Sequence, residues 1–156
     1  MSRAFVSEER TDANAAALPE RPVSAAPNLV TPDGLKHIDA EVIRLQTLLG
    51  ASASDDPARA GLARDLRYWR ARQSSAQVVA PVDGMPEEVA FGTRVTIRRG
   101  GSTTTYRIVG EDEADPSRGL LSWTSPLAQS LMGTRAGDEV DVGGGRPAVT
   151  VLDVQS

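Results

Sequence analysis

The hydrophobic period changes once along this chain, and the change divides it into a helical part and a strand part. In the first part, apolar residues recur at spacings of three and four, as in the stripe of an α-helix, at Leu35, Ile38, Val42, Leu45 and Leu49. From residue 91 onward the period is two, with Val95 and Ile97 on one face of a predicted strand and charged or polar residues on the other. Helices followed by strands predict an α+β fold.

A second helical stripe follows the first after a short polar linker at residues 51–55. Its members are Leu62, Leu66, Trp69, Gln73 and Ala76. Start signals precede both stripes, because Thr31-Pro32 and Asp56-Pro57 each place a capping side chain before a proline suited to the first turn. The first helix is predicted to stop at Gly50. The stripes predict an antiparallel helical hairpin, a short coiled coil over residues 31–80, with arms of about 20 residues and about 30 Å.

The segments on either side of the hairpin lack both periods. Residues 1–30 are rich in Ala, Pro, Ser and Glu, and we expect a disordered tail, with a short partner-binding segment as the alternative. Residues 81–90 contain prolines and a glycine and are predicted to be a linker. The remaining residues, 91–156, form the predicted C-terminal domain.

The pattern of this C-terminal domain predicts a small antiparallel sheet with one short helix. Besides the strand after residue 91, strands are predicted at residues 103–109, 120–123, 139–142 and 148–154. The helix is predicted over residues 126–132, with Ser125 as N-cap and Gly133 as C-cap. The acidic residues at positions 111–113 and 115 predict a solvated hairpin turn, with a cation site as the alternative.

The composition excludes several classes of function. The chain has no cysteine, which rules out disulfides, thiolate zinc sites and cysteine nucleophiles. Its single histidine, His37, cannot form a histidine cluster for a metal, and the formal net charge of −4 gives no general affinity for nucleic-acid phosphates. No apolar run approaches the roughly 20 residues of a membrane span, and the N-terminus shows no signal pattern. We expect a soluble, cytoplasmic monomer.

Two motifs in the C-terminal domain carry a family resemblance. Residues 105–116 read TYRIVGEDEADP, and residues 121–133 read LSWTSPLAQSLMG. Together they resemble the C-terminal domain of the Gre transcription elongation factors, and the resemblance runs from about residue 31 to the C-terminus. It implies an FKBP-like fold for the sheet, bacterial RNA polymerase as the partner, and a position at the secondary channel of that enzyme. By the same resemblance, the polymerase-docking residues are Thr124, Ser125, Pro126 and Leu127.

The tip of the hairpin departs from the family pattern. Gre factors carry acidic residues there, in Asp-Leu and Glu-Asn-x-Glu-Tyr, that help to hold a second Mg²⁺ so that the polymerase cleaves its own transcript. Here residues 52–59 read SASDDPAR, the arm is shorter, and Asp55 and Asp56 are the acidic residues left at the tip. In one interpretation Asp56 caps a helix and Asp55 is solvated. In the other, the pair contacts polymerase-bound Mg²⁺.

Arginines outnumber acidic residues on the second helix. A solvated charged face is one interpretation, and a basic face that lines the channel near the transcript 3′ end is the other. The candidates for a basic channel face are Arg59, Arg64, Arg67 and Arg70.

These observations predict a factor that binds RNA polymerase at its secondary channel and modulates elongation or initiation without strong stimulation of transcript cleavage. It contacts nascent RNA and DNA only indirectly, within the transcription complex, and we expect no enzymatic activity and no cofactor of its own. A true cleavage factor that uses the acidic tip is the first alternative. A regulator of nucleoside diphosphate kinase type is the second, and a prolyl isomerase is suggested by the fold alone.

Overall fold

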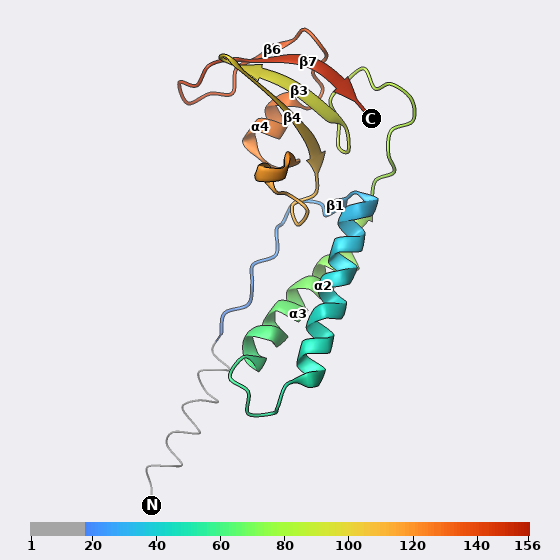
Figure 1. Ribbon diagram of the computed structural model, residues 1–156, viewed down its shortest axis with the longest axis vertical. Helices are drawn as coiled ribbons and strands as arrows, with labels where there is room; N and C mark the ends of the chain where they lie inside the picture. Colours follow the sequence, from blue (N-terminus) through green and yellow to red (C-terminus); the bar gives the residue numbers. More distant parts are fainter. Residues whose placement is uncertain (1–17) are drawn as a thin grey trace, which may run out of the picture. The chain divides into compact units, whose positions relative to one another are not determined.

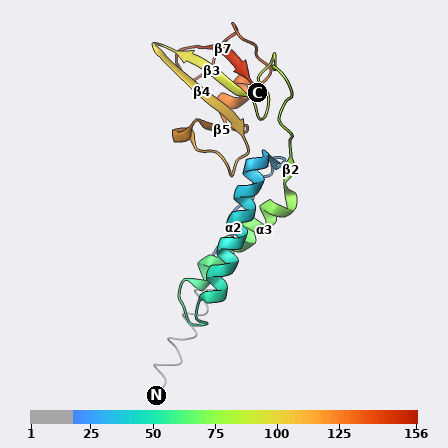
Figure 2. The same cartoon turned by 45° about the vertical axis from the view of Figure 1, so that its right-hand side comes forward.

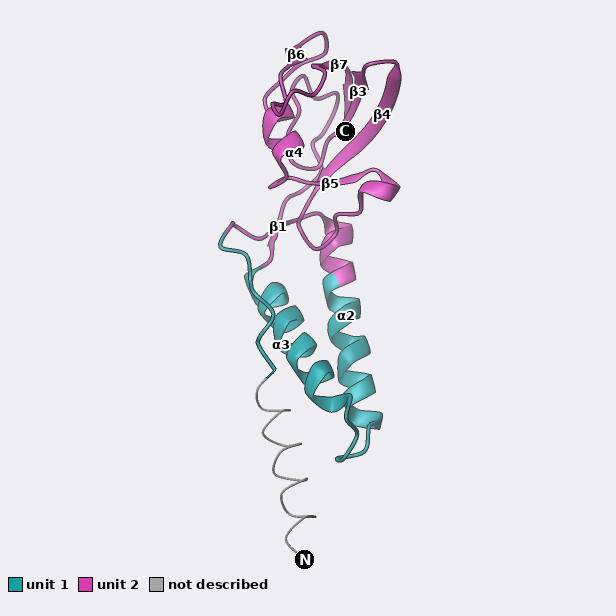
Figure 3. Cartoon of the chain, turned by 90° about the vertical axis from the view of Figure 1, so that its left-hand side faces the viewer, with its two compact units in different colours: residues 1–25, 38–75 teal, residues 26–37, 76–156 magenta. Residues whose placement is uncertain are grey.

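The computed structural model describes residues 18–156, and these residues form two compact units. The described part of the helical unit comprises residues 18–25 and 38–75, and the sheet unit comprises residues 26–37 and 76–156 (Figure 3). This division differs from the predicted limits at residues 31, 81 and 91, because the start of the first helix belongs to the sheet unit. Most of the predicted tail, residues 1–17, lies outside the described residues.

The helical unit is a hairpin of α2 (Pro32–Ala51) and α3 (Arg59–Ser75), which run side by side in opposite directions (Figure 1). Its core is formed by Val42, Leu45 and Leu66, with Leu49, Leu62 and Trp69 packed against them. The predicted helical stripes are therefore confirmed at the positions that face the seam. The ends differ slightly: α2 continues past Gly50 to Ala51, and α3 begins at Arg59 rather than at residue 57.

Residues 18–25 contact α3, which differs from the predicted disordered tail. Glu20 forms an ion pair with Arg67, with 2.6 Å between Oε1 and Nη2, and this hydrogen bond lowers the pKa of the Glu20 carboxyl. The guanidinium of Arg21 lies 3.9 Å from the centre of the Tyr68 ring, a cation–π contact. These contacts join residues far apart in the sequence, so the local pattern of residues 1–30 did not reveal them.

The sheet unit contains a five-stranded sheet in the order β5-β4-β3-β7-β6. Figure 2 labels four of these strands, β5, β4, β3 and β7. Its strands are β3 (Arg94–Arg99), β4 (Ser102–Val109), β5 (Leu120–Ser122), β6 (Glu139–Val140) and β7 (Val149–Gln155). The short helix α4 (Pro126–Leu131) contributes Ala128 and Leu131 to the same core as Val95, Ile97 and Ile108. The predicted α+β class, with a helical hairpin followed by a sheet, is confirmed.

One pair of strands corrects the predicted antiparallel sheet and its hairpin turn. β4 and β5 are parallel, whereas the other neighbouring pairs of this sheet are antiparallel. After β4 the chain passes through the acidic residues and the 3-10 helix η1 (Pro116–Arg118) before it starts β5. Parallel neighbours need such a crossover, because the chain must return to the end where it began.

A smaller two-stranded sheet joins the two ends of the hairpin sequence. β1 (Leu29–Val30) pairs in parallel with β2 (Gln77–Val78), and the Gln77 amide donates to the Asn28 carbonyl at 2.8 Å. The predicted linker at residues 81–90 is not wholly a connection, because Val89 is only 2% exposed and lies in the core of the five-stranded sheet.

The hairpin core predicts that alanine substitutions at buried apolar residues lower the free energy of unfolding more than those at exposed apolar residues. Leu45 and Leu66 are 1% and 7% exposed, so Leu45→Ala or Leu66→Ala should lower the free energy of unfolding by about 2–5 kcal/mol. Urea unfolding followed by circular dichroism at a helical wavelength measures the change. The matched control is Ile43→Ala, because Ile43 lies on the same helix but is 63% exposed. If both leucine variants unfold at the control's midpoint, the seam is assigned to the wrong residues.

Candidate functional site

The loop between β5 and α4 carries the predicted docking residues, and local hydrogen bonds hold it in place. The Ser125 hydroxyl accepts from the Ala128 amide at 3.3 Å, and the Ser125 amide donates to the Ser122 carbonyl at 3.0 Å. Ser125 has an extended backbone (φ −66°, ψ 149°), and Pro126 follows it at the start of the helix. The predicted N-cap at Ser125 is therefore confirmed. The helix ends one residue early, with Met132 at the C-cap and Gly133 following at φ 85°.

Thr124 connects this loop to the acidic segment. Its hydroxyl shares a hydrogen bond of 2.8 Å with the Ser122 hydroxyl and donates to Glu111 Oε1 at 3.4 Å. On the other side, the Gln129 amide group donates to the Trp123 carbonyl at 2.6 Å. Pro126 is exposed, whereas Leu127 is half-buried and packs against the sheet core. Pro126 is therefore exposed on a backbone that hydrogen bonds hold from both sides.

The acidic segment, residues 111–115, anchors the start of α2. Glu113 Oε2 accepts from the Thr31 hydroxyl at 2.7 Å, and the same hydroxyl accepts from the Gly34 amide at 2.9 Å. The predicted N-cap at Thr31 is therefore confirmed, and Glu113 lies where the helix dipole favours negative charge. Asp115 in turn caps η1 by accepting from the Ser117 amide at 3.1 Å. The segment is thus a set of caps and tethers, and the predicted solvated hairpin turn is wrong.

Gly110 begins this segment at a point of close backbone approach. A Cβ atom on Gly110 would lie 2.4 Å from the Leu29 carbonyl oxygen, which belongs to β1. No side chain fits at that distance, so a glycine is needed where the ends of β1 and β4 meet.

The two predicted acidic tip residues have different environments. Asp56 Oδ1 accepts from the Ala58 amide at 2.8 Å, and the Asp56 carbonyl accepts from the Arg59 amide at 3.1 Å. Asp55 is exposed and makes no hydrogen bond or ion pair with the described residues. Residues 18–156 contain no group of three or more His, Cys, Asp or Glu side chains that could hold a metal ion.

Three of the four arginines predicted for a basic face contact other parts of the chain. Arg59 Nη1 donates to the Leu49 carbonyl at 3.0 Å and to the Ser52 hydroxyl at 2.7 Å, so it closes the end of α2. Arg64 pairs with Asp65, with 3.2 Å between Nη2 and Oδ1, and Arg67 pairs with Glu20. Within the described chain, Arg70 is the member of the set that is exposed and makes no such contact.

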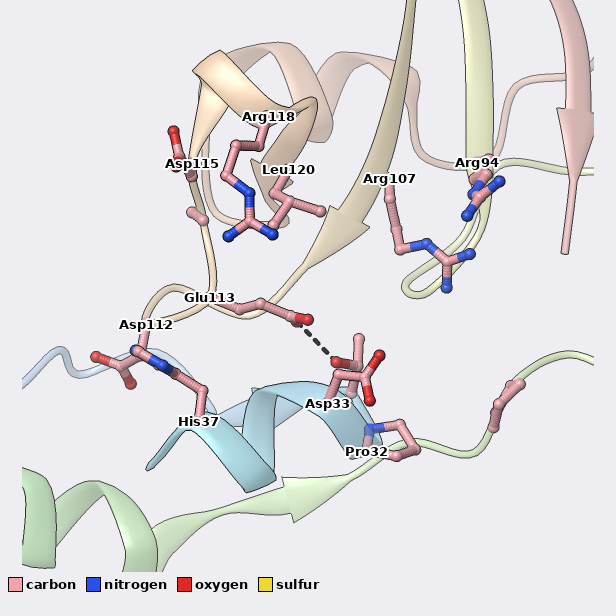
Figure 4. A pocket seen from close by; sticks show the side chains of 13 residues that line it. Pro32, Asp33, His37, Arg94, Arg107, Asp112, Glu113, Asp115, Arg118 and Leu120 are labelled. Carbon is pink, nitrogen blue, oxygen red and sulfur yellow. Dashed lines mark hydrogen bonds between the residues drawn. The ribbon is translucent and has the colours of Figure 1, made fainter. Parts of the chain in front are cut away.

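A pocket in the sheet unit was missed by the sequence reasoning. It encloses about 750 Å³ and is lined on one side by Arg94, Arg107 and Arg118 and on the other by carboxylates near the start of α2 (Figure 4). The signal was present in the strand pattern, because Arg94 and Arg107 both occupy polar positions of adjacent strands. Their register, which places them directly opposite each other, could not be read from either strand alone.

Comparison with known proteins places the chain in a family. The model for the GreA/GreB transcription elongation factor C-terminal domain matches residues 85–156. Transcription elongation factor GreB of Xanthomonas axonopodis pv. citri is 33% identical over 144 residues, which cover 77% of this chain and 84% of that protein. GreA of Desulfovibrio desulfuricans is 39% identical over 79 residues, 49% of each chain. This chain therefore belongs to the GreA/GreB family of transcription elongation factors.

The coverage of the matches varies. The chain spans about half the length of the first curated relatives that it matches, between 44% and 49% of each. Among solved structures, the GreA factor homolog 1 protein of Thermus thermophilus is 17% identical, with a TM-score of 0.39 over 84% of this chain and 100% of that one. A GreA/GreB factor from Nitrosomonas europaea is 23% identical, with a TM-score of 0.40 over 84% and 99%. No described helix is long and apolar enough to cross a membrane.

The contact at Gly110 gives a stability prediction. Gly110→Ala forces the Leu29 carbonyl to move, and overpacking of this kind should lower the free energy of unfolding by about 1–3 kcal/mol. The control is Gly101→Ala, because a Cβ there meets nothing within 4 Å. Thermal unfolding of both variants and the parent chain measures the difference. Equal midpoints for the two variants would show that β1 does not pack on Gly110.

Proposed function

We propose that this protein binds bacterial RNA polymerase at its secondary channel through the loop Thr124–Leu127. The observation that carries the proposal is the match of residues 85–156 to the GreA/GreB C-terminal domain, a region that includes this whole loop. The capped backbone at Ser125 and the exposed ring of Pro126 support it, because a loop already fixed in one conformation loses little entropy on binding. The protein then modulates elongation or initiation as a bound factor, without a catalytic group of its own.

We further propose that this protein stimulates transcript cleavage weakly or not at all. In the proposed complex, the helical hairpin extends into the channel, and its tip would have to bring carboxylates to the polymerase Mg²⁺. Coordination of Mg²⁺ needs oxygens at about 2.0–2.1 Å, so the reach and the orientation of the carboxylates both matter. Asp56 is oriented by its bond to the Ala58 amide, which leaves Asp55 as the carboxylate without such a bond.

The alternative function is true cleavage stimulation through Asp55 and Asp56. The observation in its favour is that Asp55 is exposed at the tip and makes no hydrogen bond or ion pair with residues 18–156. Two carboxylates on adjacent residues could also share one hydrated metal ion without direct coordination by both. A cleavage assay separates the two proposals.

Docking predicts the effect of a change at Pro126. Pro126→Glu adds bulk and charge at the exposed position, while Ser125 still caps the helix and the dipole favours an acid there. Co-purification with core RNA polymerase should be lost, and the circular dichroism spectrum should be unchanged. The matched control is Thr103→Glu, an exposed threonine on β4 outside the loop, which should bind as the parent chain does. Retained binding by Pro126→Glu would refute docking through this loop.

Cleavage is tested with a backtracked elongation complex that carries a labelled transcript. Added protein should release short 3′ fragments no faster than the polymerase does alone. The informative variant is Asp55→Asn with Asp56→Asn, because an asparagine side-chain oxygen can still accept from the Ala58 amide while the charge is removed. Rapid fragment release by the parent chain that disappears in this double variant would establish the alternative function.

A further inference from the structure

Two arginines in the sheet unit oppose each other without a compensating acid. Arg94 on β3 and Arg107 on β4 are directly paired in the antiparallel register. Like charges in this position are destabilising. Neither guanidinium makes a hydrogen bond or ion pair with any of residues 18–156. A neighbouring pair on the same face is satisfied, since the Thr96 and Thr105 hydroxyls share a hydrogen bond of 2.9 Å. The arginine pair is therefore a local site of unbalanced positive charge.

A third arginine lies on this side of the pocket, which also includes the carboxylate of Asp115. Arg118, at the end of η1, is exposed, lines the same pocket and makes no hydrogen bond or ion pair within the described chain. Figure 4 shows Arg94 and Arg107 on the two strands and Arg118 on η1, all on the side of the pocket opposite Asp33. Guanidinium groups present forked donors that match the geometry of phosphate oxygens. The wall therefore fits a ligand that carries several phosphate oxygens.

The opposite wall restricts the class of ligand. It is acidic, with Asp33 at the start of α2 and Asp112 and Glu113 from the acidic segment (Figure 4). Glu113 accepts from the Thr31 hydroxyl, and Asp33, whose side chain is 83% exposed, forms an ion pair with Lys36, with 3.4 Å between Oδ1 and Nζ. A continuous nucleic-acid backbone would bring phosphates against this wall and be repelled. A small ligand with phosphates at one end and hydroxyl or amine groups at the other could accept hydrogen bonds from the arginines and donate hydrogen bonds to the carboxylates.

We propose that this pocket binds a nucleoside di- or triphosphate. The phosphates lie against Arg94, Arg107 and Arg118, and the donors of the ribose and base face the carboxylate wall. The cavity of about 750 Å³ falls within the usual range for small-ligand sites, about 300–1,000 Å³. The proposal does not depend on polymerase binding, because every residue that it uses lies in the sheet unit of this chain.

The test is isothermal titration calorimetry of the full-length chain with ATP, GTP and inorganic pyrophosphate at low salt. Arg107→Gln should weaken nucleotide binding by about tenfold or more, because it removes charged hydrogen bonds. The matched control is Arg98→Gln, which removes the same charge from β3 at a position outside the pocket and should bind as the parent does. Asp33→Asn should weaken binding of the nucleotides but not of pyrophosphate.

Thermal unfolding shows whether a loss of binding in a variant comes from a loss of folded structure. Loss of one member of the Arg94–Arg107 pair relieves repulsion, so Arg107→Gln and Arg94→Gln should melt at or above the parent midpoint. Added ATP should raise the midpoint of the parent chain but not of Arg107→Gln. Three results would overturn the proposal: no nucleotide binding by the parent, equal losses in Arg107→Gln and Arg98→Gln, or tighter binding of a single-stranded oligonucleotide that depends on Arg107.

Discussion

The sheet unit depends on the contact between the end of β1 and the turn that follows β4. The Leu29 carbonyl oxygen would lie 2.4 Å from a Cβ atom on residue 110, so this crossing requires the glycine. Shortly after these two residues in the sequence, Glu113 accepts from the Thr31 hydroxyl, and the same hydroxyl caps α2. Backbone packing and a buried cap thus fix the same junction. The carboxylate wall of the pocket is built on it, because Asp33 and Asp112 adjoin these residues.

Local patterns in the sequence predicted those parts of the structure that depend on neighbouring residues. The helical stripes, the caps at Thr31 and Ser125 and the strand after residue 91 follow from spacings of a few residues. The parallel pairing of β4 with β5 did not follow, because strand direction depends on the path of the connection that contains η1, and not on the spacing of residues within either strand. The sequence analysis also missed the contacts of Glu20 and Arg21 with α3 and the register of Arg94 with Arg107, because these pairs join residues from separate segments of the chain.

Carboxylates in this chain illustrate how capping competes with chemistry. Asp56 and Asp115 each accept from the backbone amide two residues later in the chain, and Glu113 accepts from the Thr31 hydroxyl at the start of α2. From the sequence alone, the same residues were candidates for a tip metal contact or a cation site. A backbone amide in contact fixes the direction of a carboxylate oxygen and so limits where a metal ion could be bound. Asp55, which makes no such bond with the described residues, is chemically the less constrained member of the tip pair.

The acidic segment touches both candidate sites of the sheet unit. Glu111 accepts from Thr124 in the proposed docking loop, and Glu113 accepts from Thr31 at the edge of the pocket. Asp112 lies between these two residues in sequence and is one of the residues that line the pocket. A nucleotide with its phosphates on the arginines would change the electrostatic potential at Asp112. The hydroxyl and amine donors of that nucleotide would also compete with the present donors for the carboxylate oxygens of the segment. Because the segment is tethered at both ends, a nucleotide that displaced it would also act on Thr124, and the proposed pocket would then be coupled to the proposed docking loop.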